Sequence, residues 1–281
     1  VVVNRIENDA DYERTTYLLV KFIDNIIEMQ TYPFPHMEFT SKNRRNVGVG
    51  IINLAHAMAE RGLSYASRDG RNYMHHEAER MSFFLHKASI RLAKEKGQCD
   101  WFHKTTYSDG VLPINNFNKF IDDYVDGTLR YDWEALRADM ATYGMRNSVL
   151  EAYMPSESSS VTIGCTNGIE PARQHMIVKS SRQGDIPQIV PDFDKLQFDY
   201  ELAFDIPAEE YLIAMAVLQK FTGQSISTNV YYDLNKFEDR MVPLSLIVRH
   251  LLLFTKLGGK TLYYHNSDVS IKKDECENCS I

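Results

Sequence analysis

Four serines and one carboxylate lie close together in the stretch Met154-Pro155-Ser156-Glu157-Ser158-Ser159-Ser160. Small hydroxyl residues after a proline can start a helix, and the first turn of a helix offers unpaired N–H groups to an anion. Glu157 brings a negative charge to the same place and opposes that use. The stretch by itself therefore indicates either an ordinary serine-rich turn or a cradle for a phosphate group.

Two further pairs of residues have types that suit redox chemistry. Tyr263 and Tyr264 are adjacent in a segment with strand character, where neighbouring side chains normally point to opposite faces. Cys276 and Cys279 have a Cys-Glu-Asn-Cys spacing, which permits a reversible disulfide. Each pair also has a simpler interpretation. Aromatic residues are common in strands, and a Cys-x-x-Cys pair is as often half of a zinc site.

Three other motifs suggest chemistry less strongly. Cys165 has no histidine placed to activate it and is expected to be an inert, small side chain. Gly48-Val49-Gly50 lacks the third glycine of a dinucleotide motif, since Asn53 stands there, so close backbone packing is the better explanation. His75-His76-Glu77-Ala78-Glu79-Arg80 nearly spells a zinc-protease motif, but Arg80 replaces the second histidine. Solvated residues at a helix start are expected, with metal binding a remote alternative.

The elements that would position these residues change in character near residue 145. Before it, apolar periodicity and capping residues predict helices from about 11 to 30, 51 to 58, 75 to 96 and 133 to 144, the last one capped by Asp132. After it, strands are expected at Val149–Met154, Met176–Lys179, Ser225–Tyr232 and Lys260–His265, with helices at 207–222 and 243–258.

Alternating strands and helices indicate right-handed crossovers and a parallel sheet. Ligands of parallel sheets bind beyond the carboxyl ends of the strands. The serine-rich stretch follows the end of one expected strand, so this context favours a binding site over a simple turn.

Composition excludes several classes of protein. The 281 residues are 44% hydrophobic and 25% charged, with a formal charge of 31 − 38 = −7 and no lysine- or arginine-rich block, so a nucleic-acid polymer is not an expected partner. Nor is a membrane, because no apolar run approaches the length of a span and no signal peptide is visible. Four unevenly spaced cysteines do not form a disulfide framework. We expect a cytoplasmic protein.

Taken together and in order, several motifs resemble the large, catalytic subunit of class I ribonucleotide reductases. They are Met154 to Ser160, Thr166-Asn167-Gly168-Ile169-Glu170-Pro171, Gln224-Ser225-Ile226-Ser227, Lys260-Thr261-Leu262-Tyr263-Tyr264 and the terminal cysteine pair. The resemblance covers only the C-terminal part of that family's chain. It implies an α/β fold, the C-terminal half of a ten-stranded α/β barrel, with a mostly helical region at 1–145, a strand-and-helix half-barrel at 146–266 and a flexible, redox-active tail at 267–281.

The resemblance also implies roles for individual residues. In the family, a Pro-Ser-Glu-x-Ser loop holds the diphosphate of a ribonucleoside diphosphate, which carries over to Pro155, Ser156, Glu157, Ser158 and Ser159. The strand tyrosines relay a radical, entering at Tyr264 and passing through Tyr263. Stacked phenols would break the opposite-face rule, so a local twist or bulge is implied. Cys276 and Cys279 would pass the disulfide formed in each turnover to thioredoxin or glutaredoxin.

Three features of the family are missing from this sequence. It contains no Asn-x-Cys-x-Glu loop for the radical cysteine, no pair of ribose-reducing cysteines and no regulatory nucleotide-binding regions. Two explanations fit these absences: one piece of a split subunit, as is found among bacteriophages, or a degenerate remnant. The intact phosphate loop, tyrosine pair and tail favour the split subunit. It would bind no cofactor directly, and would work only with a complementary N-terminal chain and the small subunit that holds the diiron-tyrosyl radical.

Two other functions stay open. The first is a non-catalytic interaction module that binds the small subunit or a nucleotide. The second, a thioredoxin-type carrier, is less favoured, because its Cys-x-x-Cys should start a helix instead of ending a tail.

Overall fold

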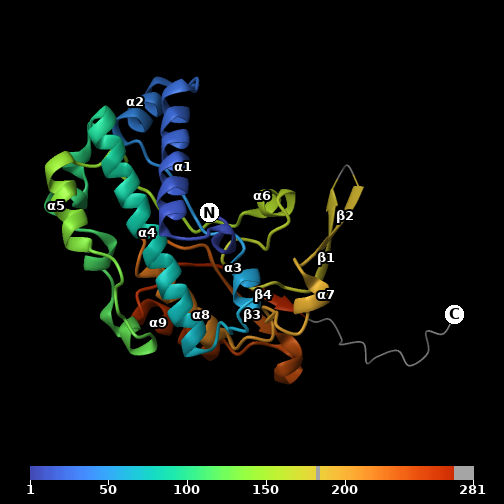
Figure 1. The fold of residues 1–281 in the computed structure, drawn as a ribbon. Helices are drawn as coiled ribbons and strands as arrows, with labels where there is room; N and C mark the ends of the chain where they lie inside the picture. Colours follow the sequence, from blue (N-terminus) through green and yellow to red (C-terminus); the bar gives the residue numbers. More distant parts are fainter. Residues whose placement is uncertain (182–183, 269–281) are drawn as a thin grey trace.

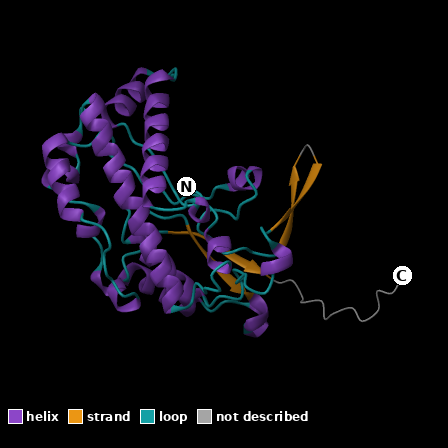
Figure 2. Cartoon of the chain, viewed as in Figure 1, coloured by secondary structure: helices purple, strands orange, loops and turns teal. Residues whose placement is uncertain are grey.

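The structure is a computed structural model that describes residues 1–181 and 184–268. This part of the chain is mainly helical, with two small two-stranded sheets (Figures 1 and 2). The helices are α1 (Asp9–Met29), α2 (Pro35–Arg44), α3 (Leu54–Ala59), α4 (Arg68–Lys96), α5 (Trp133–Tyr143), α6 (Glu157–Thr162), α7 (Phe193–Leu196), α8 (Ala208–Gln219) and α9 (Leu244–Lys256). The strands are β1 (Met176–Ser181), β2 (Gly184–Ile189), β3 (Thr228–Asp233) and β4 (Leu262–Asp268). No helix within 1–181 or 184–268 is long and apolar enough to cross a bilayer.

Side-chain caps fix where the long helices begin. Asn8 accepts a hydrogen bond from the Asp11 N–H at the start of α1, and Asp132 caps α5 as predicted. The predicted start of α4 at His75 is wrong. Ser67 caps that helix at Arg68, two turns earlier, so His75 lies inside α4, where it is buried. Polar residues in the first turns of α4 concealed its start in the sequence.

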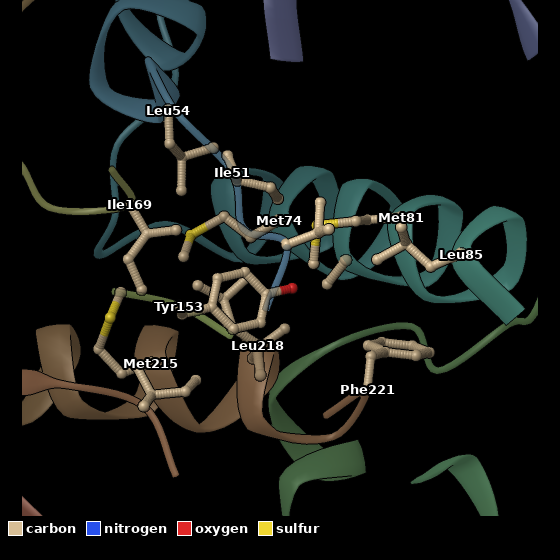
Figure 3. Close-up of a cluster of buried hydrophobic side chains, with 14 of the residues drawn as sticks. Ile51, Leu54, Met74, Met81, Leu85, Tyr153, Ile169, Met215, Leu218 and Phe221 are labelled. Carbon is tan, nitrogen blue, oxygen red and sulfur yellow. The ribbon is translucent and has the colours of Figure 1, made fainter. Parts of the chain in front are cut away.

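The core forms where α8 crosses α4 (Figure 3). Nine consecutive residues of α8, from Tyr211 to Gln219, are buried, as expected for a helix that is apolar all round. Met215 and Leu218 of this helix lie opposite Met74 and Met81 of α4, and Tyr153 fills the space between the two helices. The residue that precedes the serine-rich stretch is therefore anchored in the core.

Short extended segments carry the chain into that stretch. Residues 149–152 run parallel to residues 47–50, with hydrogen bonds from Val47 N to Val149 O (3.0 Å) and from Ala152 N to Val49 O (3.0 Å). The strand predicted at Val149–Met154 is thus an extended segment with an isolated bridge at Glu151, shorter than expected. Val2 pairs with Ile52 in the same parallel sense.

Glycines at 48 and 50 allow this close approach. A Cβ on Gly48 would lie 3.1 Å from the Ala152 Cβ, and one on Gly50 would collide with the Ala152 carbonyl oxygen. Close packing, and not nucleotide binding, explains the Gly-Val-Gly motif, as expected from the sequence.

A buried ion pair fixes the start of the same segment. Arg45 Nε donates to Asp24 Oδ1 of α1 at 2.6 Å, and Arg146 Nε lies 3.3 Å from that oxygen. Burial pushes the pKa of the fully buried Asp24 upward, but the hydrogen bond from Arg45 and the charge of Arg146 hold it below its ordinary value. Asp24 is therefore ionised and joins α1 to both extended segments.

The sheets correct the predicted topology. Met176–Lys179 was expected to join a parallel sheet, but β1 pairs with β2 in an antiparallel hairpin that projects from the helical body (Figure 1). β3 and β4 do pair in parallel, with α9 in the crossover between them. Within the described residues the strands do not form a closed barrel. Only one parallel pair of strands and a few bridged segments correspond to the predicted half-barrel.

Replacing Gly50 by alanine tests the close approach. We expect Gly50→Ala to lower the free energy of unfolding by about 1–3 kcal/mol, because the added methyl group overpacks against the Ala152 backbone. Urea denaturation followed by circular dichroism measures the change. Gly223→Ala is the matched control. Its added Cβ meets nothing within 4 Å and its φ is not positive, so a change below about 0.5 kcal/mol is expected. Equal losses in both variants would refute the packing argument.

Candidate functional site

The serine-rich stretch folds as a turn followed by the short helix α6. Ser156 is the N-cap residue and Glu157 has a positive φ of 40°. The side chain of Asn167 holds the turn together. Its Oδ1 accepts the N–H groups of Ser156 (2.8 Å) and Glu157 (2.8 Å) and the Ser156 hydroxyl (3.0 Å). The Ser156 hydroxyl in turn accepts the Gly168 N–H at 2.8 Å. The predicted helix start is present, and an amide oxygen occupies its first N–H groups.

This arrangement defines what the cradle offers to an anion. The Ser159 N–H donates to Ser156 O (2.9 Å), and the Ser160 hydroxyl donates to Glu157 O (2.7 Å). The side chains of Ser158 and Ser159 are exposed and face solvent. An incoming phosphate would therefore meet the hydroxyls of Ser158 and Ser159 first, and would compete with Asn167 for the N–H groups of the turn.

A cavity of about 190 Å³ opens beside the cradle. Its walls include Glu157 and Ser160 of α6, Asn167 and Glu170 of the following loop, and the cation Arg173. Arg173 was not predicted as a site residue, although it follows the Asn-Gly-Ile-Glu-Pro motif by two residues. Its guanidinium carbon lies 5.8 Å from the centre of the Tyr231 ring.

Cys165 lies in the wall of the same cavity. The residue is buried, and burial raises the pKa of its thiol. A protonated, buried thiol agrees with the expectation of an inert side chain.

The tyrosine pair lies at an irregularity in β4. Thr228 pairs with Leu262 and Val230 pairs with His265, so two steps along β3 correspond to three along β4. The extra residue is a bulge at Tyr263 and Tyr264, which places both rings on one side. The ring centroids are 4.1 Å apart, and the Tyr264 hydroxyl donates to the Tyr263 hydroxyl at 3.3 Å. The bulge that the resemblance implied is therefore present, and the hydrogen bond from Tyr264 raises the pKa of Tyr263.

A chain of side-chain hydrogen bonds links the cradle to the bulge. Asn167 Nδ2 donates to Glu170 Oε2 at 3.4 Å, and Asn229 Nδ2 donates to Glu170 Oε1. Asn229 Oδ1 accepts the Tyr264 N–H at 3.2 Å, which would otherwise lose its partner at the bulge. The same Asn167 and Asn229 side chains therefore hold the cradle, the carboxylate and the tyrosines in one network.

Burial sets the electrostatics of this network. It raises the pKa of Glu170, and the hydrogen bond from Asn229 acts in the opposite direction. Sequence reasoning missed Glu170 and Asn229 as linking residues. Glu170 lies in the motif that begins at Thr166, and Asn229 lies in a predicted strand. Their pairing across 59 positions could not be read from the sequence.

Some predicted features lie elsewhere. Cys276 and Cys279 lie outside the described residues. Within the described part, two groups of histidine and carboxylate side chains lie close enough to share an ion, namely His75, His76 and Glu79, and His56, Glu60 and Asp192. Neither group lines the cavity beside the cradle.

Removing Asn229 tests the link. We expect Asn229→Ala to lower the free energy of unfolding by about 1–3 kcal/mol, because the Tyr264 N–H and one Glu170 oxygen lose their partners. Amide hydrogen exchange at Tyr264 should also become faster. Asn116→Ala removes an exposed asparagine side chain and should change neither quantity. Unchanged exchange at Tyr264 in Asn229→Ala would contradict the proposed link.

Known proteins are similar to this chain over nearly all of its length. A sequence model of the family described as ribonucleotide reductase, barrel domain, matches residues 1–265. The chain is 41% identical over 266 residues to the ribonucleoside-diphosphate reductase subunit alpha of Haemophilus influenzae, and 41% identical over 264 residues to subunit alpha of ribonucleoside-diphosphate reductase 1 of Escherichia coli. It is 38% identical over 275 residues to the subunit alpha of Enterobacteria phage T4.

These alignments cover 94%, 90% and 93% of this chain, but 35%, 35% and 36% of the three relatives. The chain thus spans about a third of the length of the relatives it matches.

Proposed function

Since the chain belongs to the ribonucleotide reductase barrel-domain family, we propose that it forms part of a catalytic subunit that reduces ribonucleoside diphosphates to deoxyribonucleoside diphosphates for DNA synthesis. The relatives support this substrate class, because they are named as ribonucleoside-diphosphate reductase alpha subunits. The reaction is a radical reduction, and this chain would supply the phosphate cradle, the tyrosine relay and the redox tail.

The cradle is proposed to hold the substrate diphosphate. Pro155 and Ser156 shape the turn, Glu157 starts α6, and Ser158 and Ser159 present their hydroxyls to solvent. Arg173 in the cavity wall adds a positive charge suited to a phosphate. Substrate binding would exchange the Asn167 amide oxygen for a phosphate oxygen at the N–H groups of Ser156 and Glu157.

The tyrosine pair is the observation that carries the proposal. A radical step through phenols moves an electron and a proton together, which requires hydroxyls within hydrogen-bonding distance. Tyr264 and Tyr263 meet this requirement at 3.3 Å. A pair of adjacent strand residues reaches it only through the bulge in β4. The diiron-tyrosyl radical of a small subunit would supply the oxidising equivalent, entering at Tyr264.

A complementary polypeptide is proposed to complete the site. The cavity of about 190 Å³ is smaller than the roughly 300–1,000 Å³ of a pocket for a drug-sized ligand. The sequence also lacks the Asn-x-Cys-x-Glu loop that would attack the ribose.

Exposed apolar side chains on α1 and α2 offer a surface for that polypeptide. On α1, Phe22 and Met29 are 63% and 83% exposed, and Leu18 and Ile26 belong to the same stripe. A contiguous apolar surface of this kind indicates an interface.

The variant Tyr264→Phe separates an enzyme from a non-catalytic interaction module. In the complex reconstituted with the complementary chain and the small subunit, reductase activity should fall to the level without enzyme, because phenylalanine has no phenolic hydrogen. Binding to the small subunit should persist. Tyr143→Phe, at an exposed tyrosine of α5, is the control and should retain activity. An unchanged rate in Tyr264→Phe would favour the module, and robust reductase activity of the purified single chain would exclude the split subunit.

The redox role of the tail has its own test. Replacing Cys276 and Cys279 together by serine should stop turnover driven by thioredoxin or glutaredoxin, while a single turnover, or turnover driven by a small thiol, continues. Cys99→Ala removes a buried thiol and should spare both kinds of turnover. Loss of the single turnover in the tail variant would show that these cysteines do not act as a shuttle.

A further inference from the structure

Three potential metal ligands lie together in the middle of α4. The ligand atoms of His75, His76 and Glu79 all lie within 4.8 Å of one another. His75 and Glu79 are 1% and 0% exposed, and His76 is half-buried. The expectation of solvated residues at a helix start is therefore wrong for this group.

Each of the three side chains has one buried atom that lacks a hydrogen-bond partner in the described part of the chain. These atoms are His75 Nε2, His76 Nδ1 and Glu79 Oε2. Buried polar atoms in proteins nearly always have partners. The ring of Phe221, whose centroid is 4.8 Å from that of His75, is no conventional acceptor. Three unpartnered atoms in one place indicate a shared ligand, and electron-pair donors of this kind need a cation.

The carboxylate of Glu79 is already oriented for this role. Its Oε1 accepts hydrogen bonds from the N–H groups of Arg130 (2.8 Å) and Tyr131 (3.2 Å) and from Trp133 Nε1 (3.1 Å). These three donors fix the carboxylate and leave the buried Oε2 without a partner among the described residues. Outer hydrogen bonds of this kind hold metal ligands in place in many proteins.

Burial and nearby cations lower the pKa values of both histidines. Burial lowers the pKa of His75 to about 3 and also lowers the pKa of His76. Arg130 and Lys220 act in the same direction, and they also oppose a bound cation. Lys220 is paired with Asp122 at 2.6 Å, and the Arg130 side chain is exposed, so both charges are partly compensated. Asp126 acts on His76 in the opposite sense.

We propose that His75, His76 and Glu79 bind one divalent transition-metal ion of the Zn²⁺ type. Two imidazole nitrogens and one carboxylate oxygen suit Zn²⁺, whereas Mg²⁺ and Ca²⁺ prefer oxygen ligands alone. Bonds of about 2.0–2.1 Å put the ligands of a tetrahedral ion roughly 3.3 Å apart, so small side-chain rotations close the site. Because His76 is half-buried, a water molecule could reach the ion from that side and take the fourth coordination position. The site is independent of the proposed reductase function.

Titration of the purified full chain with Co²⁺ and Zn²⁺ tests this proposal. The chain carries Cys276→Ser and Cys279→Ser, because the tail thiols could bind either ion. Co²⁺ should give visible absorption of a tetrahedral nitrogen and oxygen site with a stoichiometry of one, and Zn²⁺ should displace it. His76→Ala is the main variant, since a half-buried residue can be removed without opening the core. It should weaken Zn²⁺ binding by about tenfold to a hundredfold.

Asp192→Asn provides the matched control at the second group of possible ligands. There His56 Nε2 already contacts Asp192 Oδ2 at 3.1 Å, and His56 Nδ1 contacts Asn53 at 3.0 Å, so those atoms have partners. This variant should bind Co²⁺ and Zn²⁺ like the parent chain. Absence of binding in the parent, or equal affinity in His76→Ala, would overturn the proposal. Loss of binding in Asp192→Asn alone would move the site to the other group and also overturn it.

Discussion

The candidate site depends on the hydrogen bonds that the buried carboxylate of Glu170 accepts. It lies in the protein interior and receives one amide donor from each side, Asn167 from the cradle and Asn229 from the strand that supports the tyrosines. A buried charge is costly unless hydrogen bonds satisfy it, so neither asparagine can leave without a penalty. The positions of the cradle and of the tyrosine bulge are therefore not independent. A phosphate that displaces Asn167 from the N–H groups of Ser156 and Glu157 would free that amide to bind Glu170 differently, and Glu170 is one hydrogen bond from the side chain that holds Tyr264.

The frame around this network depends on close backbone contact and not on a large sheet. Glycines at 48 and 50 let residues 47–50 lie directly against residues 149–152, and the buried Asp24 fixes both segments through Arg45 and Arg146. Tyr153 then enters the core between α4 and α8, immediately before the serine-rich stretch that begins at Met154. The cradle is thus a loop with a rigid entry, which suits a site whose N–H groups must stay aligned.

The sequence predicted those parts of the fold that local chemistry determines. The cap at Asp132, the buried helix after Pro207 and the parallel pairing of β3 with β4 follow from capping residues, apolar periodicity and the crossover rule. The bulge at Tyr263 followed only from the family resemblance, because local strand geometry alone predicts that neighbouring rings point to opposite faces. The β1–β2 hairpin was missed since its second strand contains a proline and little apolar alternation. The start of α4 was missed because its first turns are polar. The burial of His75 and Glu79 was missed because residues distant in sequence decide it: Phe221 packs against His75, and the 130–133 segment holds Glu79. Glu170 and Asn229 could not be paired for the same reason.

Exposure of the tyrosine rings is the strongest structural argument that the site functions in an assembly. Tyr263 and Tyr264 are 55% and 56% exposed, although their hydroxyls are already in contact. A phenoxyl radical that faces bulk water would be open to side reactions, and enzymes that use such intermediates exclude water from them. The described residues close one side of the pair through β3 and Asn229 but leave the other side open. A partner that covers the rings would both exclude water and bring the oxidant to Tyr264. The exposed surface and the proposed electron path would then have a single explanation, because the face that a partner would cover is the face through which the proposed radical would enter.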